Sequence, residues 1–204
     1  MAEVPVASGY RKLTPERERE LLRVTAELVG EVGYDRVTMA AIARQAKCST
    51  ATLYRQWESK PRLVVSAWRA HESERGGDIG QIDTGSLRGD LRGVVRTLTS
   101  GDPANHMFAS VSAAISEDEG LMDVVREILI QPILGNLTQL LDRAVARGEI
   151  APGNPVIGLT PQILLGPWLA QDILYGTYAT QGLMETILDT VLLPALAPRA
   201  AASL

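Results

Sequence analysis

The sequence predicts an all-α protein, with a three-helix domain at the N-terminus and a larger helical domain after it. Apolar side chains recur at three- and four-residue spacing, and no alternating strand pattern occurs. Residues 38–62 indicate two short helices joined by a tight turn. Segments rich in Gly and Pro separate the later helical stretches. With 204 residues, the chain can hold one large or two modest domains with a real core.

The first helix is expected to begin after Thr14 and to end at Gly33. The Thr14 hydroxyl can accept from an unpaired backbone N–H, and Pro15 fits the first helical position. Gly33 suits the αL conformation of a C-cap. The helix carries one apolar stripe, formed by Leu21, Thr25, Leu28 and Val32. Residues 1–13 precede it and are expected to form a flexible arm.

The second helix is expected from Thr38 to about Ala46. Met39, Ile42 and Ala46 share one face at helical spacing. Ala43 lies where the next helix would cross closely, because a larger side chain would push the two helices apart.

The third helix follows the turn, with Ser49 as its N-cap. Leu53 and Trp57 are four residues apart and turn inward against Ile42 and Ala43. Four residues remain on the outer face: Thr50, Ala51, Tyr54 and Arg55. None of them is both large and apolar, so this face is not built for a core.

This outer face suits the major groove of DNA. Its short leading side chains let the backbone approach base edges, while Tyr54 and the Thr hydroxyls can donate to phosphate oxygens. The alternative is a helical hairpin whose outer face is merely solvated, because the geometry alone does not prove DNA binding.

The charge distribution favours the first interpretation. The whole chain has a net charge of −4, but residues 1–75 carry 13 Lys and Arg against 10 Asp and Glu. Residues 76–204 carry 7 against 14. Positive charge therefore gathers where the two short helices are. The excess is modest, so binding should depend on individual contacts more than on a broad basic field.

The remaining elements are expected to be helices. A connecting helix begins near residue 63 and fades at 76–77, and 76–85 is a loop. The further helices are expected at about 86–99, 104–116, 121–147, 156–177 and 183–196, with breaks at 101–103 and 152–155.

The last two of these helices are apolar on more than one side, which exceeds what one core needs. Pairing with a second copy into a four-helix bundle would bury the surplus, so we expect a homodimer through 156–177 and 183–196. The alternative is a monomer in which these are the deepest helices.

Neither export nor a membrane is expected. The N-terminus lacks a basic segment followed by an apolar one, and the apolar stretch 159–175 contains polar residues and two prolines. The single cysteine fits a reducing cytoplasm. Cys48 is either a small apolar residue or a redox sensor on the turn, and the first is favoured.

An enzyme is not expected. His71, His106 and Cys48 leave little for nucleophilic or metal catalysis, and no metal-ligand spacing occurs. The acidic run 117–119 resembles a solvated helix end more than a cation site. No cofactor is predicted.

Several of these residues together resemble the DNA-binding domain of the tetracycline-repressor (TetR) family. The similarity covers roughly residues 14–65. It includes the run Ala-Glu-Leu-Val-Gly-Glu-Val-Gly-Tyr at 26–34, and then Thr38, Ile42-Ala43, Ser49, Leu53-Tyr54, Trp57 and Ser59-Lys60. Later similarity is limited to helix layout and to the phrases Arg-Gly-Glu-Ile at 147–150 and Gly-Pro at 166–167.

The chain departs from the family pattern at two positions. Trp57 stands where the family usually has Phe. Lys47 stands in the turn where the family favours Gly, and a non-glycine residue with positive φ costs about 1–2 kcal/mol. Lys47 could relax the turn, or it could add a phosphate contact.

The resemblance implies a DNA-binding domain at 14–62 and a regulatory and dimerisation domain at 63–204. Phosphate contacts would come from Thr38, Thr52, Tyr54 and Lys60, with Lys47 and Ser49 at the turn, while Thr50, Ala51 and Arg55 would face bases. A dimer would bind a near-palindromic double-stranded operator as a ligand-responsive regulator, with repression as the favoured mode of action.

In this family a small molecule inside the second domain moves the connecting helix and releases the DNA. Candidate pocket residues are Met107, Phe108, Met122, Trp168, Gln171, Asp172 and Tyr175. Met and aromatic side chains at this spacing can equally be core. The rival function is a DNA-binding dimer whose second domain takes no ligand.

Overall fold

The computed structural model describes residues 13–76, 78–99, 119–177 and 179–198, and within these ranges the chain forms helices and no strands. The N-terminal head contains α1 (Pro15–Val32), α2 (Met39–Gln45) and α3 (Thr50–Trp57), followed by α4 (Lys60–Gly76). The remaining elements are η1 (Ile79–Gln81), α5 (Leu87–Thr99), α7 (Glu119–Val125), η2 (Arg126–Ile130), α8 (Gln131–Ala146), η3 (Ile157–Leu159), α9 (Thr160–Tyr175), α10 (Gln181–Ile187), η4 (Leu188–Leu192) and α11 (Leu193–Leu196). The all-α prediction is confirmed.

The head is built around the apolar stripe of α1. Leu21 and Val29 are fully buried, together with Ile42 from α2 and Leu53 from α3. Residues of α4 join the same core, among them Leu63, Val64 and Val65. The expected boundary between residues 62 and 63 therefore falls inside a helix that packs against α1.

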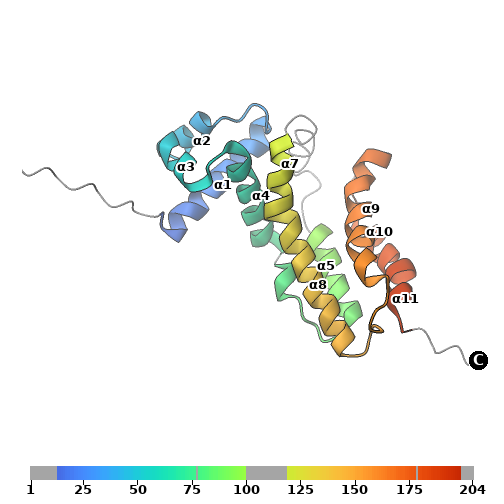
Figure 1. The fold of residues 1–204 in the computed structure, drawn as a ribbon. Coiled ribbons are helices and arrows are strands. Elements are labelled where there is room, and N and C mark those ends of the chain that lie inside the picture. The colour runs from blue at the N-terminus through green and yellow to red at the C-terminus, as the bar shows by residue number, and fades with distance from the viewer. Residues whose placement is uncertain (1–12, 77, 100–118, 178, 199–204) are drawn as a thin grey trace, which may run out of the picture.

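One long helical rod connects the head to the rest of the molecule. It consists of α7, η2 and α8, and Figure 1 shows it running from beside α4 down to α5. At the α7 end, Leu121 and Val125 are buried in the core of the head. At the α8 end, Leu137, Leu140 and Leu141 belong to a second core, which α5, α9, α10, η4 and α11 complete. The rod is thus shared by two cores.

The rod contains a π-helical turn that periodicity did not predict. In η2 the Gln131 N–H donates five residues back to the Arg126 carbonyl, and Pro132 follows directly. The same arrangement recurs in η4, where the Leu193 N–H donates to the Leu188 carbonyl just before Pro194. Proline has no N–H and its ring clashes with the carbonyl four residues earlier. The wider turn keeps both helices continuous ahead of a residue that would otherwise break them.

Several predicted boundaries need correction. The connecting helix begins at Lys60 instead of residue 63, and α8 ends at Ala146. Gly33 ends α1 with φ 84° and ψ 159°, which is not αL. This region of φ and ψ is nearly exclusive to glycine, which explains why glycine occupies position 33. The predicted αL conformation was wrong. The predicted helix 104–116 lies outside the described residues. No helix in the described ranges is long and apolar enough to cross a bilayer.

A buried carboxylate ties α5 to the end of α8. Asp90 is fully buried and accepts from the Thr84 N–H (2.6 Å), the Thr84 hydroxyl (2.7 Å) and Arg147 (3.1 Å). Arg147 also donates to Glu149, which accepts from the Leu87 N–H at 2.7 Å. Burial by itself raises the pKa of Asp90, but these hydrogen bonds and the Arg147 charge outweigh it and hold the pKa below its ordinary value.

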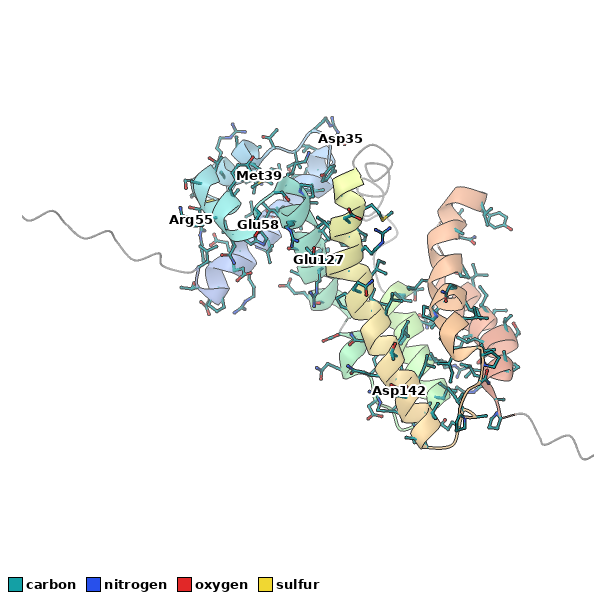
Figure 2. All side chains as sticks on the ribbon, in the orientation of Figure 1. Asp35, Met39, Arg55, Glu58, Glu127 and Asp142 are labelled. Carbon is teal, nitrogen blue, oxygen red and sulfur yellow. The ribbon has the colours of Figure 1, made fainter. Side chains whose placement is uncertain are left out.

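We predict that Asp90→Asn lowers the free energy of unfolding at pH 7 by about 1–3 kcal/mol, because Arg147 loses a buried charged partner. The depressed pKa stabilises the folded state above the unfolded pKa of about 4, and this contribution is lost as pH falls through the folded value. Wild type and variant should therefore converge in stability under acid. Urea unfolding at neutral and acid pH measures this. Asp142→Asn, at an exposed site on α8 (Figure 2), is the control. A difference between wild type and Asp90→Asn that persists under acid would contradict the account.

Candidate nucleic-acid interface

Side-chain caps define both short helices of the head. The Thr38 hydroxyl accepts from the Ala41 N–H at 3.1 Å and begins α2. The Ser49 hydroxyl accepts from the Thr52 N–H at 3.1 Å and begins α3, and its oxygen lies 2.8 Å from the Thr52 hydroxyl. The predicted N-cap role of Ser49 is confirmed. Three of the predicted DNA-contact side chains, those of Thr38, Ser49 and Thr52, therefore lie at helix N-termini, where backbone N–H groups favour anions such as phosphate.

The turn between α2 and α3 keeps the conformation that favours glycine. Lys47 has φ 50°, so the turn does not relax to accommodate it. The Lys47 N–H donates to the Arg44 carbonyl (3.3 Å), and the Cys48 N–H donates to the Ala43 carbonyl (2.9 Å). The Lys47 side chain is exposed next to α3. A second non-glycine residue with positive φ, Glu58 (65°), ends α3 and was not foreseen.

The outer face of α3 is open to solvent. Leu53 and Trp57 are buried, whereas Thr50, Ala51 and Arg55 are exposed. Tyr54 is 52% exposed, which is high for an aromatic side chain. In Figure 2, Arg55 lies on the head, far from Asp142 at the opposite end of the molecule. The structure thus brings the predicted base-facing residues together on one surface, which the described part of the chain leaves exposed.

Lys60 also has a role inside the head. Its ammonium group donates to the carbonyls of Tyr34 (2.9 Å) and Val37 (3.3 Å) and lies 4.1 Å from the centre of the Tyr34 ring. It therefore holds the loop that precedes α2. An ammonium group has three donors, so one remains for another acceptor. A phosphate contact by Lys60 stays a prediction.

Arg17 was not predicted and reaches the turn from α1. Its guanidinium donates to the carbonyls of Ala46 (2.5 Å) and Lys47 (3.3 Å). No local spacing links residues 29 or 30 positions apart, so the sequence pattern carried no signal for this contact.

Cys48 packs partly buried against the core of the head. Burial raises the pKa of its thiol, and the nearby Arg17 charge opposes this only in part. Because the thiolate is the reactive form, a raised pKa favours the packing interpretation over a redox sensor.

The candidate pocket residues are only partly described. Met107 and Phe108 lie outside the described residues, as do the side chains of Trp168 and Asp172. Met122 is half-buried on α7. Gln171 donates to the Thr177 hydroxyl at 3.3 Å, and Tyr175 is 71% exposed. A shallow open groove of about 330 Å³ lies elsewhere, lined by Leu22, Ser66, Arg69, Ala70, Ser73 and Ile128. The pocket therefore stays a prediction.

Comparisons with known proteins agree with this architecture. Residues 21–67 match the family model of bacterial regulatory proteins of the tetR family, and residues 81–191 match the tetracyclin repressor-like C-terminal domain. An uncharacterised HTH-type transcriptional regulator of Mycobacterium tuberculosis is 34% identical over 186 residues, covering 88% of each chain. The DNA-binding transcriptional repressor TetR of Mycobacteroides abscessus is 35% identical over 136 residues, covering 65% of this chain and 70% of that protein.

The fold is likewise shared with solved structures. A TetR family transcription regulator superposes with a TM-score of 0.68 at 24% identity, covering 90% of this chain and 100% of the other. The two family models and the named relatives identify a DNA-binding transcriptional regulator of helix–turn–helix type and not an enzyme. The chain belongs to the tetracycline-repressor family.

We predict that Lys47→Gly raises the free energy of unfolding by about 0.5–1 kcal/mol, because relief of left-handed strain exceeds the added entropy of the unfolded chain. Glu58→Gly is the control, since it also replaces a non-glycine residue of positive φ but removes no positive charge. If Lys47 contacts phosphate, only Lys47→Gly should reduce the slope of log K against log salt, by about 0.9 per contact. Urea unfolding and fluorescence anisotropy at several salt concentrations measure the two effects. Equal salt slopes for the two variants would remove Lys47 from the interface.

Proposed function

We propose that this chain is a transcriptional repressor that binds a near-palindromic operator as a homodimer. A small-molecule effector in the C-terminal domain would release the DNA. The observation that carries the proposal is the outer face of α3, which is exposed, capped at Ser49 and free of aliphatic side chains larger than Ala51. Two such faces related by a two-fold axis would enter successive major grooves about 34–36 Å apart.

The homodimer is supported by large apolar side chains that stand exposed within the described part of the chain. Leu174 is 67% exposed on α9 and Val191 is 50% exposed on η4, while Leu159 on η3 is 53% exposed. All three lie in the two segments expected to pair. TetR-family regulators act as dimers, and a four-helix interface would bury these side chains.

Repression and effector response are supported by named relatives. The HTH-type transcriptional repressor KstR of Rhodococcus jostii is 30% identical over 196 residues, covering 81% of this chain and 89% of that protein. The FadR regulator of Bacillus subtilis, solved in complex with stearoyl-CoA, shares the fold with a TM-score of 0.60. An acyl-CoA is therefore a reasonable first probe for the second domain.

The rod forms a direct physical link from the second domain to the head. Leu121 and Val125 are buried in the core of the head, and Arg62 on α4 pairs with Glu127 on η2 at 2.6 Å. Figure 2 shows Glu127 where the rod passes α4. A shift of the rod would therefore move α4, and with it the head.

Two variants test the DNA assignment. We expect Tyr54→Ala to weaken binding to all duplexes by a similar factor, because a phosphate contact carries no sequence information. Arg55→Ala should also change sequence preference, costing about 1–3 kcal/mol at the base that it contacts. Anisotropy titrations on the selected operator and on a scrambled duplex measure both. Equal losses for Arg55→Ala on the two duplexes would refute its base-reading role.

A second experiment tests the effector response. We expect an acyl-CoA or another screened compound to raise the melting temperature and to weaken operator binding, and operator DNA to weaken compound binding by the same factor. Glu127→Gln should leave compound binding intact but lower the coupling free energy between the compound and the operator by about 0.5–2 kcal/mol. Asp123→Asn is the control, because Asp123 pairs with Arg126 on the same rod at 2.8 Å.

An unchanged coupling factor in Glu127→Gln would contradict the proposed route through the rod. If no compound both stabilises the protein and releases the operator, the alternative hypothesis of a DNA-binding dimer without a ligand is favoured.

A further inference from the structure

The guanidinium of Arg17 binds the backbone of the turn between α2 and α3. One of its terminal nitrogens, Nη2, donates to the carbonyls of Ala46 and Lys47, at 2.5 and 3.3 Å. The other, Nη1, donates to Glu20 on the next turn of α1, at 2.6 Å. Only 30% of the Arg17 side chain is exposed. The Glu20 contact orients the planar group, whose donors have a fixed geometry.

The two carbonyls belong to the peptide groups on either side of the Lys47 Cα atom. Their directions together determine φ and ψ of Lys47, so one guanidinium restrains both angles. Lys47 has φ 50°, a strained conformation for a residue with a side chain. Such strain persists only where the surroundings over-determine it. Arg17 supplies that restraint from a helix outside the turn.

The conformation of Lys47 sets the direction in which α3 leaves the turn. Ser49, the N-cap of α3, follows Lys47 by two residues, and Thr50 and Ala51 come next. A rotation at Lys47 would move these leading residues away from base edges, while the buried Leu53 and Trp57 would still hold the rest of the helix. Binding to specific sequences is therefore more sensitive to this turn than is the stability of the head.

We propose that Arg17 is a positioning residue for operator recognition, which acts by locking the left-handed turn at Lys47. This inference rests on the proposed DNA-binding function. It gives a role to a residue that contacts the turn and not the outer face of α3. A glycine at position 47 would need no such restraint, so the requirement for Arg17 belongs to the particular residue that this turn carries.

The test is a double-mutant cycle between Arg17→Met and Lys47→Gly. Arg17→Met removes the donors but keeps an aliphatic side chain, and Arg19→Met removes a charge from an exposed pair on the same helix, Arg19 with Glu16 at 3.7 Å. Binding is measured by anisotropy at a temperature where every variant is folded. One probe is a duplex that the wild-type protein enriched from a random library, and the other is a scrambled duplex of equal length and composition.

We expect Arg17→Met to weaken operator binding about tenfold, as for loss of hydrogen bonds from a charged group, with a smaller loss on the scrambled duplex. In the Lys47→Gly background the same change should cost less than about threefold, because a relaxed turn no longer needs the restraint. Arg19→Met should change neither the ratio of operator to scrambled-duplex affinity nor the dependence of that ratio on the residue at position 47. A change in the ratio of the two affinities is not produced by partial unfolding, which lowers both alike.

Other outcomes would overturn the proposal. Equal losses on both duplexes and in both backgrounds, with a shallower salt dependence, would make Arg17 a phosphate contact. If Arg17→Met bound both duplexes as Arg19→Met does, Arg17 would have no role in binding. If the wild-type protein enriches no duplex, the proposed function fails instead. The urea unfolding midpoints of the wild type, Arg17→Met, Lys47→Gly and the double variant then still test whether Arg17 restrains Lys47. Additive shifts in midpoint would show that it does not.

Discussion

The proposed DNA-binding surface, the outer face of α3, lies on a helix that is too short to be stable alone. With eight residues, α3 is below the length at which isolated helices persist in water. Its position comes from burial of Leu53 and Trp57 in the core of the head and from the Ser49 cap. Because these two side chains turn inward, Thr50, Ala51 and Arg55 must face outward. The outer face is a geometric consequence of the core.

Two cations from neighbouring helices hold the segment in front of α3. Lys60 from α4 donates to the carbonyls of Tyr34 and Val37 ahead of α2, and Arg17 from α1 donates to the carbonyls after it. α2 is therefore fixed at both ends by donors from outside the motif. α4 also packs against the rod and pairs with it through Arg62, so the helix that carries Lys60 contacts both the loop ahead of α2 and the rod.

The sequence predicted the parts of this arrangement that have a local signature. Apolar spacing located α1, α2 and α3, and hydroxyl residues marked their starts at Thr14, Thr38 and Ser49. The π-helical turns escaped prediction because apolar spacing continues across them, although Pro132 and Pro194 offered a signal. The contacts of Arg17 and Lys60 join residues far apart in the chain, and no spacing rule identifies such pairs. The positive φ of Glu58 was not predicted, because no glycine marks that position in the sequence.

The most direct test of the central claim is selection of duplexes from a random library by the wild-type protein. If the exposed face of α3 reads bases in a symmetric dimer, the enriched sequences should contain two inverted half-sites with centres about 10–10.5 base pairs, or a multiple of that, apart. Enrichment of a single asymmetric site, or of no sequence at all in dilute buffer, would contradict the account.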